Sequence, residues 1–456
     1  MWRGKFFLNL LALLLLLAAP ALARNPAGKL SGTPRWSGEI VLSQPVTVPK
    51  GVTLAIAAGT RIRATKAEAT LVISGTLLAR GTAEKPIIFD TPPGWQGIHF
   101  FEAPEVSELE HLTIDGAATA ISSIAAKFAV RFCSFTGNGT AIKLLRESYP
   151  LVEDCRFADN DIAIDNEMKS VATIRRNRFT GHKNSAIIAS HNSGGPIIDN
   201  LFEKNSQAIA LLQKYPDRVE NNRFIENGTG IFCNQTQATP RIQFNSFEKN
   251  ENALINFSFA YPLVENNRFV NNGTAVRNDQ FSSPNISRNL FQDNRTALFN
   301  DRKSNPTVEF NQFEGNELAF FCDHSSYPLI RNNNLIGSRV AVRLGQFQSA
   351  DWEQRAGSKR IVQQKAMEQN SRNPLLEGAP TEFRDRVDLS GNWWGDDTAQ
   401  LRKATEESNL DLFHDRFDQP TVTYEGYGDE SYRLDRIVYQ PILDRPVADT
   451  RPKEAP

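Results

Sequence analysis

Three aspartates recur at a fixed interval in the second half of the chain, because Asp279, Asp301 and Asp323 are each 22 residues apart. Equivalent residues of stacked parallel strands lie about 4.8 Å from one another. Carboxylates at that spacing repel, which raises their pKa values or attracts a cation. Paired carboxylates are also the groups that acid and base chemistry on sugars requires. We therefore predict these aspartates as catalytic residues on an outward-facing column.

Cationic side chains accompany the aspartates and would suit an acidic substrate. The predicted substrate-binding residues are Arg277, Arg302, His324 and Arg343. An arginine can hold a uronate carboxylate through two hydrogen bonds or stabilise an anionic intermediate. The alternative is that the aspartates are solvated or paired with Arg277 and Arg302, and bind no ligand.

A second, basic column lies immediately before the phenylalanines of a repeat. It consists of Arg156, Arg178, Arg223 and Arg268, and acids precede three of these by three residues, at Glu153, Glu220 and Glu265. Pairing between these charges on a solvated face explains the column. The alternative is a stripe that binds a polyanion. Phe232, Phe299 and Phe321 each adjoin a predicted core position, where they either stack on sugar rings or pack beneath the insert predicted at 350–386.

Metal chemistry has little support in the sequence. The six histidines are scattered, without the paired spacing of a metal site. We therefore predict no metal site and no firm cofactor. Calcium, which prefers carboxylate oxygens, is the one cation that the aspartate column leaves open.

A repeat of 22 or 23 residues determines where all these side chains lie. Its phenylalanines are Phe135, Phe157, Phe179, Phe202, Phe224, Phe247, Phe269, Phe291 and Phe313. A β-branched residue precedes each by five positions, and asparagine precedes most of them by two. A fixed period with β-branched, aromatic and small positions in register indicates stacked identical units. Asparagine and glycine disfavour an α-solenoid, and the leucine-dense pattern of a leucine-rich repeat is missing.

Each repeat is expected to form one coil of three short strands. Phenylalanine then packs on phenylalanine, and the asparagines form a hydrogen-bonded ladder along a sharp turn. Cys133 and Cys155 take the asparagine position in adjacent coils. Stacked parallel strands fit the dihedral angle of a disulfide poorly, so we expect free thiols there.

The rest of the chain divides around this array. Residues 1–23 have a basic start, an apolar run and an Ala-Leu-Ala cleavage site, which predicts a signal peptide and a periplasmic or extracellular protein. We predict an N-terminal cap and first coils at 24–100, repeats at 101–349, an insert at 350–386, a C-terminal coil and cap at 387–446, and a disordered tail at 447–456. The net charge of −1 and the lack of a second apolar run predict neither a nucleic-acid partner nor a membrane span.

Several segments resemble a known superfamily. Units such as Val-Glu-Asn-Asn-Arg-Phe at 264–269 resemble the repeat of the pectate-lyase-like superfamily, also called the carbohydrate-binding and sugar-hydrolysis repeat. The segment at 392–395, Asn-Trp-Trp-Gly, is similar to the Asn-x-Trp-Gly element that often follows such arrays. The resemblance implies an all-β, right-handed parallel β-helix with both ends capped and a short helical or irregular insert. It also implies a superfamily of lyases, hydrolases, epimerases and a periplasmic copper-site accessory protein.

These observations favour an exported protein that binds or processes an acidic polysaccharide, such as a cell-envelope glycan, on an outer strand face. If it is an enzyme, we expect a polysaccharide lyase, hydrolase or epimerase. One alternative is a non-catalytic structural or adhesive solenoid of the envelope. A second is a periplasmic accessory protein of a metalloenzyme, against which the scattered histidines argue. The sequence leaves the oligomeric state open.

Overall fold

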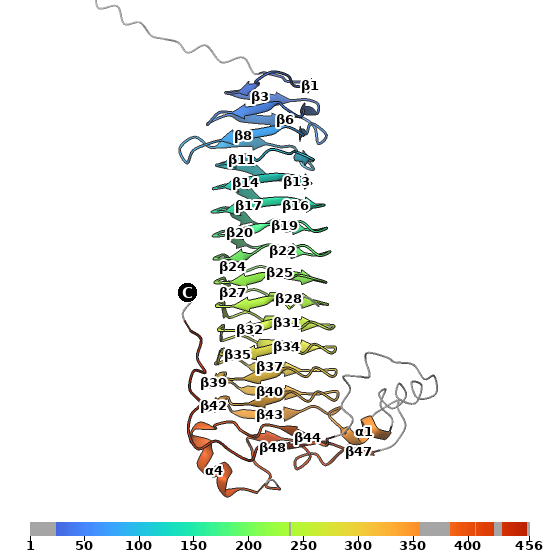
Figure 1. Ribbon diagram of the computed structural model, residues 1–456, viewed down its shortest axis with the longest axis vertical. Coiled ribbons are helices and arrows are strands. Elements are labelled where there is room, and N and C mark those ends of the chain that lie inside the picture. Colours follow the sequence, from blue (N-terminus) through green and yellow to red (C-terminus); the bar gives the residue numbers. More distant parts are fainter. Residues whose placement is uncertain (1–23, 237–238, 356–383, 406, 424–430, 454–456) are drawn as a thin grey trace, which may run out of the picture.

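The computed structural model describes residues 24–236, 239–355, 384–405, 407–423 and 431–453 (Figure 1). The predicted signal peptide and most of the predicted insert lie outside these ranges. Within them, no helix is both long enough and apolar enough to cross a membrane.

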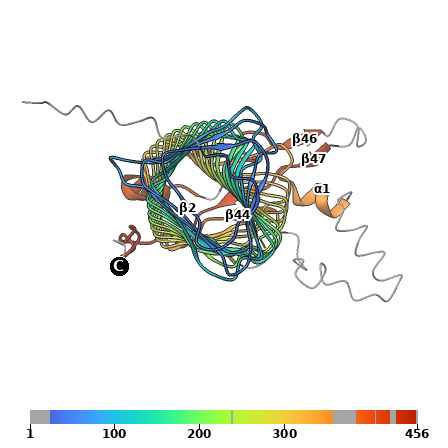
Figure 2. The same ribbon diagram turned by 90° about the horizontal axis from the view of Figure 1, so that it is seen from above.

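Three long parallel sheets wind around a common axis (Figures 1 and 2). Sheet 1 has 16 strands, from β1 (Gly28–Lys29) to β45 (Phe413–His414). Sheet 2 has 14 strands, from β2 (Arg35–Trp36) to β41 (Leu329–Arg331), and sheet 3 has 14, from β3 (Glu39–Leu42) to β42 (Asn334–Ile336). Neighbours within a sheet come from successive coils of about 22 residues. The prediction of an all-β, right-handed parallel β-helix is confirmed.

A typical coil shows how the repeat produces this shape. Strand β31 (Asn252–Phe257) lies in sheet 1, β32 (Leu263–Glu265) in sheet 2 and β33 (Arg268–Val270) in sheet 3. The single inward side chain of β33 is Phe269, which pairs in register with Phe247. From Phe135 to Phe313 the stacked rings lie 4.6–5.1 Å apart between centroids. Each coil therefore packs the same interior residues against their equivalents in the next coil.

The predicted asparagine ladder lines the turn from sheet 2 to sheet 3. Asn245 donates its backbone N–H and its side-chain Nδ2 to Oδ1 of Asn267, at 2.9 and 3.1 Å. The ladder continues past the repeats, because Asn333 makes the same two bonds to Asn392. Asn266, just before Asn267, has a φ of 57°, which asparagine tolerates better than most residues. Cys133 and Cys155 occupy the ladder as buried free thiols.

A second ladder, which we did not predict, lines the turn from sheet 3 to sheet 1. It includes Asn138, Asn160, Asn205, Asn227, Asn250, Asn272, Asn294 and Asn316, three residues after the phenylalanines. Asn250 bonds to Asn272 as Asn245 does to Asn267. The turns on either side of sheet 3 are therefore both held by buried amides.

Other elements cover the C-terminal end of the solenoid (Figure 1). After β43 (Val340–Leu344) comes helix α1 (Ala350–Arg355), at the start of the predicted insert, whose residues 356–383 lie outside the described ranges. The end also contains β44 (Arg386–Asp388), η1 (Gly395–Asp397), α4 (Thr398–Lys403), β46 (Thr421–Thr423), β47 (Ser431–Arg433) and β48 (Arg436–Val438). Strand β44 pairs with β48 in parallel, and β46 pairs with β47 in antiparallel.

The C-terminal tail differs from the predicted disorder of residues 447–456. Its described part, up to Lys453, lies along the outside of sheet 3 (Figure 1). Val447 exchanges two hydrogen bonds with the side chain of Asn334, at 2.8 and 3.0 Å. The sequence of the tail did not reveal this docking, because the polar residues that bind the tail lie more than a hundred residues away in the chain.

Candidate functional site

The predicted catalytic aspartates form what we call the aspartate corner, where sheet 1 turns toward sheet 2. Asp279 ends β34 (Thr274–Asp279), Asp301 follows β37 (Thr296–Asn300), and Asp323 follows β40 (Leu318–Cys322). The structure therefore stacks them as predicted from their spacing. They do not face outward, however, since only 3%, 7% and 8% of their surfaces are exposed.

The first two carboxylates pair with neighbouring cations, although Oδ1 of Asp279 accepts no hydrogen bond from the described residues. Asp279 accepts a hydrogen bond from Arg277 at 2.9 Å, and the Nε of Arg302 lies 3.6 Å from its other oxygen. Asp301 accepts the backbone N–H of Arg302 at 2.9 Å and is bonded to Nδ1 of His324 at 2.7 Å. The alternative raised from the sequence, pairing with Arg277 and Arg302, describes this geometry.

The third carboxylate is enclosed by the next coil. Asp323 accepts the backbone N–H groups of His324 and Phe347 through one oxygen, at 2.9 and 2.8 Å. A Cβ placed on Gly345 would lie 2.2 Å from the carboxylate carbon, so the backbone passes directly over it. Helix α1 covers the corner further, because Glu353 pairs with Lys303 at 2.7 Å. The described residues therefore leave only a small part of Asp323 exposed to a substrate.

The pKa values follow from this enclosure. Burial raises the pKa of Asp323 above its ordinary value. Burial acts in the same direction on Asp301, but the hydrogen bond and the charge of His324 outweigh it and lower the pKa of Asp301. The same hydrogen bond raises the pKa of His324. Asp301 and His324 thus behave as an ion pair.

Asp301, Asp323 and His324 also form a group that the histidine spacing did not indicate. One possible ligand atom from each lies within 4.8 Å of the others. The sequence predicted no metal site because His324 has no histidine partner nearby in the chain. The fold brings it instead against Asp301 of the preceding coil.

The remaining predicted binding residues lie on the outer face of sheet 1. Arg277, Phe299, Phe321 and Arg343 are successive members of one column. The guanidinium of Arg277 lies 4.7 Å from the ring centroid of Phe299, which stacks on Phe321 at 4.6 Å. Arg343 is exposed, and Phe232, further up the same column, is half-buried. Among the described residues, no ion pair or hydrogen bond joins the side chain of Arg343 to the aspartates that it was predicted to serve.

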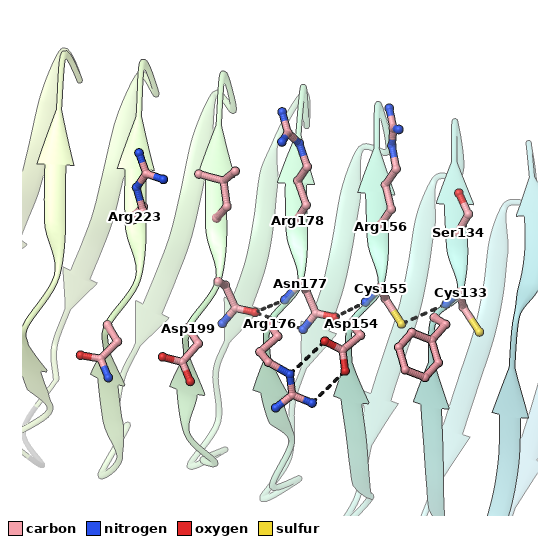
Figure 3. A pocket seen from close by; sticks show the side chains of 14 residues that line it. Cys133, Ser134, Asp154, Cys155, Arg156, Arg176, Asn177, Arg178, Asp199 and Arg223 are labelled. Carbon is pink, nitrogen blue, oxygen red and sulfur yellow. Dashed lines mark hydrogen bonds and ion pairs between the residues drawn. The ribbon is translucent and has the colours of Figure 1, made fainter. Parts of the chain in front are cut away.

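The basic column lies along an open groove, which we call the arginine groove (Figure 3). Its volume is about 720 Å³. One rim consists of outward residues of sheet 3: Ser134, Arg156, Arg178, Leu201 and Arg223. The other rim is the turn from sheet 2, with Phe132, Asp154, Arg176, Asp199 and Asn221. The asparagine ladder, including Cys133 and Cys155, forms the floor between them.

The glutamates expected to neutralise this column pair with other arginines. Burial would raise the pKa of Glu153, but hydrogen bonds from Arg131, Arg175 and Arg176 outweigh it and lower that pKa to about 2. Glu220 and Glu265 also have other partners, at Arg218 and Arg288. The turn places these glutamates in sheet 2 and the column in sheet 3, on different faces of the solenoid.

Three arginines of the basic column consequently remain free. Among the described residues, Arg156, Arg223 and Arg268 make no side-chain ion pair or hydrogen bond, whereas Arg178 pairs with Glu203 at 2.5 Å. Of the four arginines in the groove lining, Arg176 and Arg178 have acidic partners, so Arg156 and Arg223 are the ones that make no ion pair among the described residues. The sequence could have indicated these unpaired arginines only through the turn that separates each glutamate from the arginine three residues later.

Comparison with known proteins supports the fold. A family model described as "Right handed beta helix region" matches residues 94–215 and 125–262. A second, described as "Periplasmic copper-binding protein (NosD)", matches residues 242–396. No curated protein matches the chain.

Solved structures give a distant likeness. A mutant tailspike protein of E. coli bacteriophage HK620, in complex with a pentasaccharide, has 13% identity and a TM-score of 0.33, over 66% of this chain and 60% of that chain. Another structure of the same tailspike with pentasaccharide has 12% identity and a TM-score of 0.29, with the same coverage. The match spans less than two thirds of the tailspike chains.

The name of the second family model raises the question of copper. Copper sites favour imidazole and thiolate ligands. Within the matched range, the group at the aspartate corner has a single imidazole, whose Nδ1 is already bonded to Asp301 at 2.7 Å. Cys322 is fully buried. These described residues do not fit a copper centre, and the alternative of a metalloenzyme accessory protein gains no support from them.

Proposed function

We propose that this parallel β-helix repeat protein is an exported protein that binds an acidic polysaccharide in the arginine groove. The observation that carries the proposal is the exposed arginine column on the rim of an open groove of about 720 Å³, in which Arg156 and Arg223 have no ion pair or hydrogen bond among the described residues. Arg156 and Arg178 lie on adjacent coils, and Arg223 and Arg268 follow at intervals of two coils. Cations repeated along a groove suit a ligand whose anionic groups also repeat, such as a polyuronate.

The choice of a glycan among polyanions rests on the compartment. The predicted signal peptide directs the chain out of the cytoplasm, where nucleic acid is concentrated. The match of residues 242–396 to a family model named as periplasmic is consistent with export. Arginine suits carboxylate recognition because its planar guanidinium offers two parallel donors.

Binding is favoured over cleavage by the contrast between the two sites. The carboxylates of the aspartate corner are buried and each already has a partner within the described residues, so little of their surface faces a polymer. A catalytic role for Asp279, Asp301 and Asp323 remains a prediction, as does calcium binding there. Both enter the experiment as separate arms.

The test is a binding series with the chain from residue 24 onward. Affinities for polygalacturonate, alginate and neutral dextran are measured for the wild type, the Arg156→Ala/Arg223→Ala double variant and Asp301→Asn, with calcium or with chelator. We expect binding to the uronate polymers, weakened by salt, and a loss of about tenfold or more in the double variant, since a hydrogen bond to a charged group contributes about 1.5–3 kcal/mol.

Arg295→Ala is the matched control, because Arg295 is also exposed and has no ion pair among the described residues, but lies in the turn from sheet 3 to sheet 1. Equal binding of the double variant and the wild type would refute the arginine groove as the site. Loss of binding or of polymer breakdown in Asp301→Asn alone would move the function to the aspartate corner. No binding to any polymer would favour the structural or adhesive solenoid.

A further inference from the structure

The rim of the arginine groove on sheet 3 continues beyond the groove, and its character changes along the way. In register, the column is Ser134, Arg156, Arg178, Leu201, Arg223, Ser246, Arg268, Leu290, Gln312 and Asn334. All its arginines are exposed, and all lie before Leu290. The last three members are uncharged and buried, at 2%, 5% and 4% exposure. One column thus has a cationic open part and a neutral covered part.

The C-terminal tail is what occupies the covered part. Thr450 is buried, accepts a hydrogen bond from Asn334 at 3.0 Å and donates one to Gln312 at 2.8 Å. Arg451 pairs with Glu314 at 2.5 Å. The tail therefore runs back along the solenoid, across the strands, toward the arginines. Thr450 acts as a buried anchor for it.

The described part of the tail reaches the C-terminal end of the arginine column. The backbone N–H of Lys453 donates to Oδ1 of Asn266 at 3.2 Å. Asn266 holds the same turn position as Asn221 on the opposite rim of the groove, with nearly the same φ, and is two residues before Arg268. Lys453 is exposed, and its side chain has no partner among the described residues. Arg451, by contrast, is already paired.

We infer that the tail bounds the arginine column at its C-terminal end, two coils beyond the groove, and that Lys453 is a ligand-binding residue there, adding a cation beside Arg268 for the anionic groups of an extended acidic polymer. The inference rests on the proposed function and specifies the ligand further. Arg156 and Arg268 are five coils apart, or about 24 Å at the usual strand spacing. Only a polymer of about that length reaches every cation from Arg156 to Lys453.

The dependence on ligand length separates this role from a structural one. Affinities for a short and a long oligogalacturonate are measured for the full chain, Lys453→Ala, Thr450→Val and Arg223→Ala. Lys127→Ala is the matched control, because Lys127 is an exposed lysine without a described partner at the start of a sheet 2 strand. Lys453→Ala is expected to weaken the long oligomer by about 2–5-fold, as for one exposed charge pair, and the short oligomer by less.

Thr450→Val tests the anchor while the charge of Lys453 is kept. It removes the hydroxyl that bonds Gln312 and Asn334, so it should lower affinity for the long oligomer about as much as Lys453→Ala. If Arg223→Ala weakens binding but both tail variants bind like the wild type, this inference fails and the proposed function stands. Tighter binding after truncation at Pro446 would also overturn it, since the tail would then compete with the ligand. If the full chain binds no oligomer, both proposals fail.

Discussion

The aspartate corner and the arginine groove are both columns of like charge stacked coil upon coil, but they resolve the repulsion differently. The aspartates have short side chains at a turn that the next coil covers, so each carboxylate is buried and bonded to a cation or to backbone N–H groups. The arginines have long side chains on the outer face of three-residue strands, where water and salt screen them.

This difference shows that periodic charge alone does not identify a binding site. A buried charge must be paired within the protein, because leaving it unpaired costs several kcal/mol. An exposed one can remain free and available to a ligand. The accessible column is the better candidate site, although the acidic residue types of the other column are more typical of sugar chemistry.

The largest expected effect comes from removing an acceptor in the aspartate corner. Asp323→Ala leaves the buried N–H groups of His324 and Phe347 without their partner, so we expect a loss of about 1–3 kcal/mol in the free energy of unfolding. Chemical denaturation measures it. Asp323→Asn keeps the accepting oxygen and should cost clearly less. A corner that served only chemistry would show the reverse: unchanged stability in both variants and a loss of activity or binding.

The next effect concerns pH and the pair of Asp301 and His324. Because the pKa of His324 is raised, its contribution is complete below the unfolded value of about 6.5 and is lost as pH rises through the folded value. Because the pKa of Asp301 is lowered, its contribution is present above about 3.9 and is lost as pH falls through the folded value. The pair therefore stabilises the fold between about pH 4 and 6.5.

His324→Phe tests this window, since it keeps a ring to stack on Phe347 but cannot carry a charge. The difference in Tm from the wild type should be greatest between about pH 4 and 6.5 and should shrink above it. Burial raises the pKa of Asp435 to about 7, which lowers the stability of both proteins alike as pH rises toward 7 and cancels in the difference. A difference in Tm that stays constant from pH 4 to 9 would show that the ring matters only through packing.

The fold could be predicted because each interior position of a coil stacks on its own equivalent. The spacing of Phe247 and Phe269, and of Asn245 and Asn267, already states the register that the strands adopt. The second ladder carried an equally clear signal, as at Asn250 and Asn272, but some of its asparagines, such as Asn272, also begin Asn-x-Thr sequons that the repeat produces.

The sites were harder to predict. The spacing of the repeat shows which residues stack in one column, but it does not show whether a column at a turn points into the core or toward solvent. Asp301 follows a strand directly, and whether it points in or out depends on the backbone of the turn and on what the next coil places over it. The pairing of Glu153 with sheet 2 arginines depends in the same way on which side of a turn each residue lies. The docking of the tail depends on contacts across more than a hundred residues, as between Val447 and Asn334.

The smallest expected effect concerns Arg178, the member of the arginine column that is paired with an acidic residue of the protein. Arg178 donates to Glu203, whose side chain is 25% exposed, while Arg156 and Arg223 on the same column are free. Glu203→Gln should free Arg178 and remove a negative charge from the rim. We therefore expect affinity for polygalacturonate to rise by about 2–5-fold, the range that an exposed ion pair contributes.

Glu226→Gln is the control. Glu226 follows the next strand of sheet 3 and pairs with Lys204 at 3.8 Å, and neither residue lines the groove. Unchanged affinity in Glu203→Gln, with Arg223→Ala still weakened, would mean that the ligand passes Arg178 without contact and follows only the free arginines.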